Sequence, residues 1–285
     1  MTLKIIAWKP NMFPEPGKCY YGMPNEVYHG LKEWHGSTDL KHVLRSVESF
    51  RYEKEQPTPE DKIAFERGNS FHVGMEGIIE DGDLSLYQEK VLPCPTKTIT
   101  SKASKDLKAD NPGCYVLPET ERDNCAEMIQ NVYRKGSKLN FFDEGYSELS
   151  FFWVDPETGI RLKCRPDWMM FDDDDVLWMS DFKTAADHQR EAFQRVILNL
   201  NYHLSAAMYI EGVFRVTGIK AGHFPFIVCA NTPPFEVEVY DLDQPSLAEG
   251  HALFRKCLDD VANYEPDKQL EIKTVKLPRW GFKLT

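Results

Sequence analysis

The sequence lacks the marks of several protein classes. Its seven cysteines contain no Cys-x-x-Cys pair, so reduced thiols in a cytoplasmic protein are favoured over a disulfide framework or a zinc ribbon. Four cysteines at cluster spacing are missing as well, so we expect no iron–sulfur cluster. No apolar run reaches the length of about 18 residues that a membrane span requires, and the N-terminal stretch is too weakly apolar for a signal peptide.

Positive charge is scarce. The chain has 34 Lys and Arg against 45 Asp and Glu, which gives a net charge of −11. This balance weighs against a nucleic-acid partner, because surfaces that bind phosphate are usually basic. Binding depends on the local charge distribution, however, and two stretches are locally basic. The first carries Lys97, Lys102, Lys105 and Lys108, and the second is Arg161-Leu-Lys-Cys-Arg165. The first stretch is as typical of a solvated loop as of a DNA contact.

The remaining composition describes one globular chain of 285 residues without internal repeats. We expect a single domain, 1–285, made of N-terminal strands and a helix (1–57), a catalytic core (58–241) and a C-terminal helix and tail (242–285).

The pattern of apolar residues predicts alternating helices and strands. Helices are expected at 37–50, from Thr58 onward, and at 119–135, 188–213 and 245–263; strands at 145–154, 159–171, 176–184, 219–230 and 235–241; and a long loop at 93–118. This order predicts an α/β core with a mixed central sheet flanked by helices.

One expected helix carries a stripe of four residues at helical spacing: Ala64, Gly68, His72 and Met75. Gly68 would let another backbone approach closely, and His72 would face inward on the same side. A lone histidine on an apolar helix face is usually a core residue, so the stripe alone leaves the role of His72 open.

The most informative stretch runs from Arg165-Pro-Asp-Trp, through an acidic turn at 172–175, to Ser180-Asp-Phe-Lys-Thr. On a strand, Asp181 and Lys183 project to the same face because they are two residues apart. If the two strands pair, Asp167 joins them. Two carboxylates can hold a hard divalent cation and an ammonium can orient a water, which suits metal-assisted hydrolysis of a phosphodiester.

The four consecutive aspartates of the turn invite a calcium interpretation. They lack the glycine and the distal glutamate of an EF-hand loop, so a polar hairpin turn is favoured.

The order of Glu148, Asp167 and Asp181-Phe-Lys183 resembles the core of PD-(D/E)xK (restriction-endonuclease-like) nucleases. More narrowly, the chain resembles the catalytic domain of RecE-type exonuclease VIII from prophages. Four segments carry the likeness, which spans roughly residues 25–265: Tyr28-His, Gly68-Asn-Ser-Phe-His, Asp181-Phe-Lys-Thr-Ala and Tyr202-His-Leu-Ser-Ala-Ala-Met-Tyr.

The resemblance implies a role for each matching position. The implied metal ligands are His72, Asp167, Asp181 and the Phe182 carbonyl, and the implied metal is Mg²⁺, with Mn²⁺ as a substitute. Lys183 would position the attacking water, since an ordinary lysine is protonated at neutral pH. Glu148 would help to hold the metal, although a surface carboxylate on an edge strand is the alternative.

The chain departs from the family pattern on the helix that follows. Related nucleases usually carry Gln-x-x-x-Tyr there; Tyr209 matches the tyrosine, but Ser205 occupies the glutamine position. Serine offers one hydroxyl and no planar amide. Two alternatives stay open: Ser205 reaches the phosphate through a water molecule, or Gln194 or Tyr202 compensates for the shorter side chain. Arg165 is a further candidate for supporting the site or contacting DNA.

The resemblance implies a Mg²⁺-dependent exodeoxyribonuclease that degrades linear double-stranded DNA 5′→3′ and leaves 3′ single-stranded tails for recombination. It further implies a ring-shaped homo-oligomer, a tetramer, around DNA ends, with a RecT-type single-strand annealing protein as partner. Two alternatives stay open: a repair-type or CRISPR-type endonuclease or exonuclease of the same core, and a catalytically silent DNA-binding module.

Overall fold

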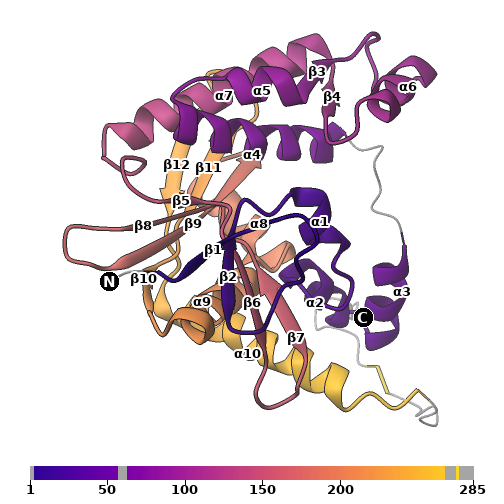
Figure 1. Ribbon diagram of the computed structural model, residues 1–285, viewed down its shortest axis with the longest axis vertical. Coiled ribbons are helices and arrows are strands. Elements are labelled where there is room, and N and C mark those ends of the chain that lie inside the picture. The colour runs from indigo at the N-terminus through magenta and orange to yellow at the C-terminus, as the bar shows by residue number, and fades with distance from the viewer. Residues whose placement is uncertain (1–2, 57–62, 267–273, 276–285) are drawn as a thin grey trace, which may run out of the picture.

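The computed structural model describes residues 3–56, 63–266 and 274–275. Its central sheet has six strands, in the order β12-β11-β9-β8-β5, with β10 also paired to β9 (Figure 1). The bounds are β5 Tyr146–Ser147, β8 Trp168–Phe171, β9 Leu177–Ala185, β10 Ala221–His223, β11 Phe226–Ala230 and β12 Val237–Tyr240. β9 runs antiparallel to β8 and parallel to β11. The predicted mixed sheet is therefore confirmed.

Alternating side chains on β11 define the two faces of this sheet. Phe226 and Val228 belong to one buried apolar cluster, whereas Ile227 and Cys229 belong to another. Side chains with a period of two point to opposite faces of a strand, so both faces must be covered.

Helices cover both faces of the central sheet. The first cluster contains residues of α2 (Ser37–Val43), α8 (Arg190–Asn199), α9 (Tyr202–Thr217) and α10 (Gln244–Ala262), and the second contains residues of α4 (Ile63–Asp81), α5 (Ser85–Lys90) and α7 (Glu119–Ser137). Figure 1 shows α4, α5 and α7 together at the top of the view and α9 and α10 below. The sheet thus lies between two helical layers, which confirms the expected α/β architecture.

A second sheet holds strands that we expected in the central one. Its order is β1-β2-β6-β7. The bounds are β1 Ile5–Ala7, β2 Lys18–Tyr21, β6 Ser150–Val154 and β7 Arg161–Cys164. Phe151 and Trp153 face the main core, while Phe152 packs with Tyr20 and Trp34 on the other side. The short helix α1 (Asn25–Gly30) belongs to this N-terminal region and precedes the one helix that we expected there.

Two predicted helices are each broken in two. The segment 37–50 forms α2 and then α3 (Val47–Glu55), because the Ser46 side chain accepts a hydrogen bond from the Ser49 N–H at 3.0 Å and caps a new helix. The segment 188–213 forms α8 and α9, because Asn201 between them adopts a left-handed conformation with φ 51°.

The expected long loop at 93–118 is wrong. It contains β3 (Val91–Pro93), α6 (Lys102–Asp110) and β4 (Tyr115–Leu117), and β3 pairs with β4 in parallel. Ser101 caps α6 by accepting from the Ser104 N–H at 3.2 Å. The expected helix start at Thr58 and most of the chain after 266 lie outside the described residues.

The close backbone approach that we expected at Gly68 occurs at another glycine. A Cβ on Gly68 would meet nothing within 4 Å, whereas a Cβ on Gly250 of α10 would lie 2.1 Å from the His203 backbone oxygen of α9. Gly250 is therefore a position where the absence of a side chain lets the backbones of two helices approach closely.

We expect Gly250→Ala to lower the free energy of unfolding by about 1–3 kcal/mol, because α9 and α10 must separate to fit the methyl group. Gly68→Ala is the matched control in another helix. Its added methyl is unobstructed, so it should raise the free energy of unfolding by up to about 1 kcal/mol. Urea denaturation measures both. Equal changes in the two variants would contradict the assigned packing.

Candidate active site

The β8–β9 hairpin brings the first two predicted acids together. The strands pair with Trp168 opposite Ser180, and the Asp167 N–H donates to the Ser180 carbonyl at 3.1 Å. The Asp167 Oδ2 accepts a hydrogen bond from the Phe182 N–H at 2.5 Å. The Asp181 and Asp167 carboxyls lie within hydrogen-bonding distance of each other. The predicted strand pairing is thus confirmed.

The turn between these strands is the polar hairpin turn that the sequence favours. One oxygen of Asp172 accepts hydrogen bonds from the Asp174 N–H at 3.0 Å and the Val176 N–H at 2.9 Å. Its other oxygen accepts from the Trp178 indole at 2.9 Å. These bonds hold the acidic turn closed.

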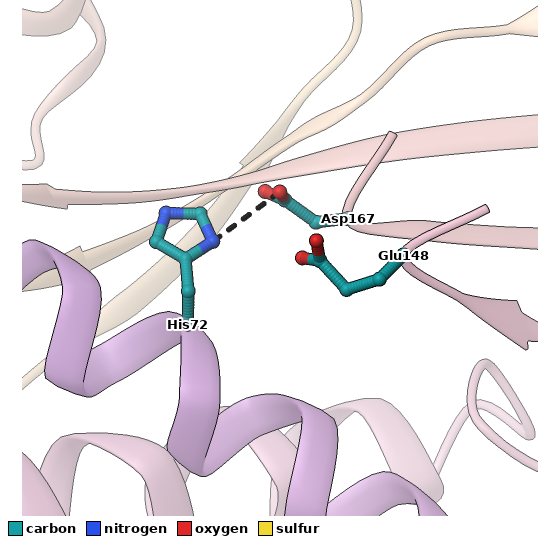
Figure 2. A group of neighbouring side chains, drawn as sticks. All are labelled: His72, Glu148 and Asp167. Atoms are coloured by element: carbon teal, nitrogen blue, oxygen red, sulfur yellow. Dashed lines mark ion pairs between the residues drawn. The ribbon is translucent and has the colours of Figure 1, made fainter. Parts of the chain in front are cut away.

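His72 reaches the hairpin from the middle of α4. Its Nδ1 lies 3.2 Å from Asp167 Oδ1 (Figure 2). The imidazole also packs against the Phe182 ring at a centroid distance of 6.4 Å. Figure 2 shows His72 and Glu148 on opposite sides of a small space beside Asp167.

Glu148 reaches the same space from a turn rather than from the interior of a strand. The predicted strand 145–154 is interrupted there, because Glu148 has φ 52° and separates β5 from β6. Its N–H donates to the Asp167 carbonyl at 3.3 Å. A non-glycine residue pays a conformational cost for this backbone, and the turn directs the carboxylate toward Asp167.

These three side chains form a candidate metal centre. One ligand atom each from His72, Glu148 and Asp167 lie within 4.8 Å of one another. Ligands that bind one Mg²⁺ at about 2.1 Å are at most about 4.2 Å apart, so the side chains need to close by less than about 1 Å. The two carboxylates suit Mg²⁺ or Mn²⁺, whereas the imidazole is a ligand more typical of softer divalent metals. Asp181, next to Asp167, can supply a further oxygen.

Burial and neighbouring charges give the carboxyl groups of this site different pKa values. Burial raises the pKa of Glu148 to about 8, with the charge of Asp167 adding to the shift. Burial likewise raises the pKa of Asp181 to about 6. Burial alone would raise the pKa of Asp167 too, but His72 and Lys183 lower it to about 2. The site therefore gathers carboxyl groups, two of which, Glu148 and Asp181, have charged forms that are disfavoured without a cation and would be stabilised by a divalent one.

Lys183 lies on the same face as Asp181, as its position two residues on predicts. Its ammonium donates to Asp181 Oδ1 and, at 3.3 Å, to the Phe182 carbonyl. Burial alone would lower the pKa of Lys183, but the charges of Asp181 and Asp167 raise it above its ordinary value. Lys183 is thus a cation that can donate hydrogen bonds.

With this geometry established, the chain can be compared with known proteins. Residues 36–269 match the family described as "PDDEXK-like domain of unknown function (DUF3799)". This chain belongs to that family. No curated protein is similar enough in sequence to match the chain.

Among solved structures, the fold matches a protein from Eubacterium rectale described as a "Putative exonuclease". The TM-score is 0.55 at 14% sequence identity, over 90% of this chain and 97% of that chain. At this identity the likeness shows the fold. A second structure, described as SSO0001, has a TM-score of 0.30 at 10% identity over 67% of this chain and 84% of that chain, and supports no argument.

Two of the expected support residues lie close to the site. The Tyr202 ring lies 5.0 Å from the Lys183 ammonium. Tyr209 is close enough to Asp181 for that charge to add to the effect of burial, which raises the pKa of Tyr209 well above its ordinary range. Tyr209 also packs edge-on against Phe224, the ordinary role for a tyrosine on this helix.

The other two candidates on this side have no direct contact with the acids. Ser205 is buried on α9, and its hydroxyl makes no hydrogen bond to Asp167, Asp181 or Lys183 among the described residues. Gln194 is exposed and lines a separate hollow with His203 and other residues of α8, α9 and α10. The structure therefore does not bring Gln194 into the site.

The positive charges that precede Asp167 hold the N-terminal segment. Arg165 donates to Ser150 Oγ at 2.8 Å and to the Met23 carbonyl at 3.0 Å, and its Nη1 lies 3.7 Å from Glu148. Lys163 donates to the Tyr28 carbonyl at 2.6 Å. Arg165 thus touches a candidate ligand, but most of its contacts join strands to the N-terminal segment.

Sequence reasoning missed two charged residues near the site. Glu76 follows His72 by one turn of α4, and burial raises its pKa, with the charge of Glu80 adding to the shift. The i, i+4 spacing from His72 could have indicated it. Lys41 of α2 lies 5.1 Å from the Tyr202 ring, and no sequence signal pointed to it.

In the basic stretch 96–108, Lys108 pairs with the buried Glu66 of α4 and so anchors α6.

No helix among residues 3–56, 63–266 and 274–275 is long and apolar enough to cross a membrane.

We expect divalent cations to bind more tightly as pH rises from about 6 to about 8. Burial raises the pKa of Glu148 to about 8 and the pKa of Asp181 to about 6. Both must lose their protons to bind a cation, so binding releases protons below these values and affinity levels off above them. Calorimetry with Mn²⁺ in buffers of different ionisation enthalpy measures affinity and proton release. An affinity that stays flat across this range would contradict the prediction.

Proposed function

We propose that the chain is a metal-dependent nuclease that hydrolyses phosphodiester bonds in DNA. One observation carries the proposal: His72, Glu148 and Asp167 converge beside the Asp181–Lys183 pair. Membership of a PDDEXK-like family and the fold shared with a protein described as a putative exonuclease support it.

The chemistry follows from the residues around this space. A bound Mg²⁺ would neutralise charge on the phosphate and lower the pKa of a water molecule. His72, Glu148, Asp167 and Asp181 would hold it. Lys183, protonated and anchored by Asp181, can donate a hydrogen bond to the attacking water or to a phosphate oxygen. Water adds to phosphorus, the bond to the 3′ oxygen breaks, and that oxygen takes up a proton.

The finer proposal is a Mg²⁺-dependent 5′→3′ exonuclease of the RecE type that acts on linear double-stranded DNA and leaves 3′ single-stranded tails for recombination. Its support is the resemblance in four segments, which include Gly68-Asn-Ser-Phe-His and Asp181-Phe-Lys-Thr-Ala. The description of the structural neighbour as a "Putative exonuclease" agrees with it.

The same resemblance supports a ring-shaped homo-oligomer, a tetramer, and a RecT-type annealing protein as partner. A ring would reconcile DNA binding with a net charge of −11, because a basic lumen can coexist with an acidic exterior.

We expect the wild-type protein with Mg²⁺ to release the 5′ label early from linear duplex DNA labelled separately at each end. EDTA should abolish release, and Lys183→Ala should reduce it by about 100-fold or more, because one preorganised donor of this kind contributes about that much. Lys256→Ala is the matched control, since Lys256 is exposed on α10 and pairs with Asp260 on the same helix. It should cleave like the wild type.

Other outcomes of this assay separate the alternatives. Cutting of closed circles would indicate an endonuclease of the repair or CRISPR type. No cleavage by folded protein with Mg²⁺ or Mn²⁺ would overturn the proposal in favour of a silent DNA-binding module, and Ser205 at the glutamine position would be the first residue to change.

A further inference from the structure

A second lysine lies beside the candidate active site. Lys41 extends from α2, and its ammonium lies 5.1 Å from the centre of the Tyr202 ring. The Lys183 ammonium lies 5.0 Å from the centre of the same ring. Both distances are short enough for cation–π attraction. One aromatic ring therefore keeps two cations within about 10 Å of each other.

Lys41 differs from the other partly buried lysines in having no hydrogen-bond acceptor within the described part of the chain. Lys163 donates to two backbone carbonyls, Lys183 to Asp181 and Lys108 to Glu66. Among the residues that the structure describes, the Lys41 ammonium makes no hydrogen bond or ion pair. Its contact with the Tyr202 ring is a cation–π contact.

This arrangement is costly in the absence of a ligand. An ammonium that is partly removed from water without an acceptor loses hydration and gains only the attraction of the ring. Burial, together with the nearby charge of Lys183, lowers the pKa of Lys41 to about 8. An anion beside Lys41 would supply the missing acceptor and offset the repulsion between the two lysines.

The position of Lys41 indicates which anion would bind beside it. Lys183 joins Asp181 to the Tyr202 ring, and Lys41 contacts the same ring. In Figure 1, α2, which carries Lys41, lies below α4, which carries the candidate metal ligand His72. A DNA strand whose scissile phosphate lies at Lys183 and that runs past Tyr202 toward α2 would pass Lys41. The neighbouring group on such a strand is another phosphate.

We propose that Lys41 binds a phosphate group of the substrate strand next to the scissile one, with the Tyr202 ring holding its ammonium in place. This inference rests on the proposed nuclease function and adds a residue that contacts the substrate. The phosphate is either an internal diester or a terminal 5′ monoester, since both present the same oxyanion to an ammonium.

The test compares wild type, Lys41→Met, Lys41→Arg and Lys256→Ala, with the full chain throughout. Methionine keeps the apolar stem without the charge, and arginine keeps the charge. We expect Lys41→Met to bind duplex DNA about 10-fold more weakly than the wild type. Binding is measured in Ca²⁺, so that cleavage is suppressed. The slope of log affinity against log salt should fall by about 1, which is the loss of one phosphate contact. Lys41→Arg should recover most of the binding, and Lys256→Ala should match the wild type.

Cleavage in Mg²⁺ on 5′-phosphorylated and 5′-hydroxyl duplexes identifies the phosphate. A raised KM for Lys41→Met on both duplexes indicates the internal diester, and one confined to the phosphorylated duplex indicates the terminal monoester. Both results support the inference. Wild-type affinity, salt slope and KM in a folded Lys41→Met protein would overturn it.

A measurement on the unsubstituted side chain covers the case in which Lys41→Met does not fold. With lysines ¹³C-dimethylated, the Lys41 methyl signal, assigned with Lys41→Arg, should shift on addition of duplex DNA. An unmoved signal would overturn the inference. Wild-type protein that binds DNA but does not cleave it would refute the nuclease proposal, while the salt slope and the methyl signal would still decide the role of Lys41.

Discussion

The candidate site depends on the contacts that one aspartate makes to three segments of the chain. The Asp167 N–H bonds to Ser180, its Oδ2 accepts from the Phe182 N–H, its carbonyl accepts from the Glu148 N–H, and its Oδ1 faces His72. The backbone bonds set the register of the hairpin and the position of the Glu148 turn. The same residue therefore organises the sheet edge and offers a carboxylate to a cation.

Concentrating acids in this way costs stability, and the apolar layers compensate for it. Burial raises the pKa values of Glu148 and Asp181, which means that the folded metal-free protein disfavours their charged forms. The helices on both faces of the sheet keep these groups in place, because their burial does not depend on the acids. A site held under electrostatic strain by a rigid scaffold is typical of a place where a cation binds.

The lysine and arginine side chains in and near the site have two different roles. Lys163 and Arg165, which precede Asp167, bind backbone carbonyls of the N-terminal segment, and Arg165 also binds the Ser150 hydroxyl of β6, so they tie that segment to the second sheet. Lys183 and Lys41 remain near Asp181 and the Tyr202 ring. A chain with a net charge of −11 can therefore still present cations where an anionic strand would lie, since local arrangement outweighs the total.

The sequence by itself determined the α/β class, the hairpin and the grouping of Asp167, Asp181 and Lys183, because strand periodicity and turn chemistry act over a few residues. It did not reveal the helix break at Asn201, where a left-handed residue interrupts an unbroken apolar pattern. Only the tertiary structure decided that His72, the Glu148 turn and Lys41 meet this hairpin. Their segments are far apart in the chain, and their approach depends on how helices pack across a sheet, which no local pattern encodes.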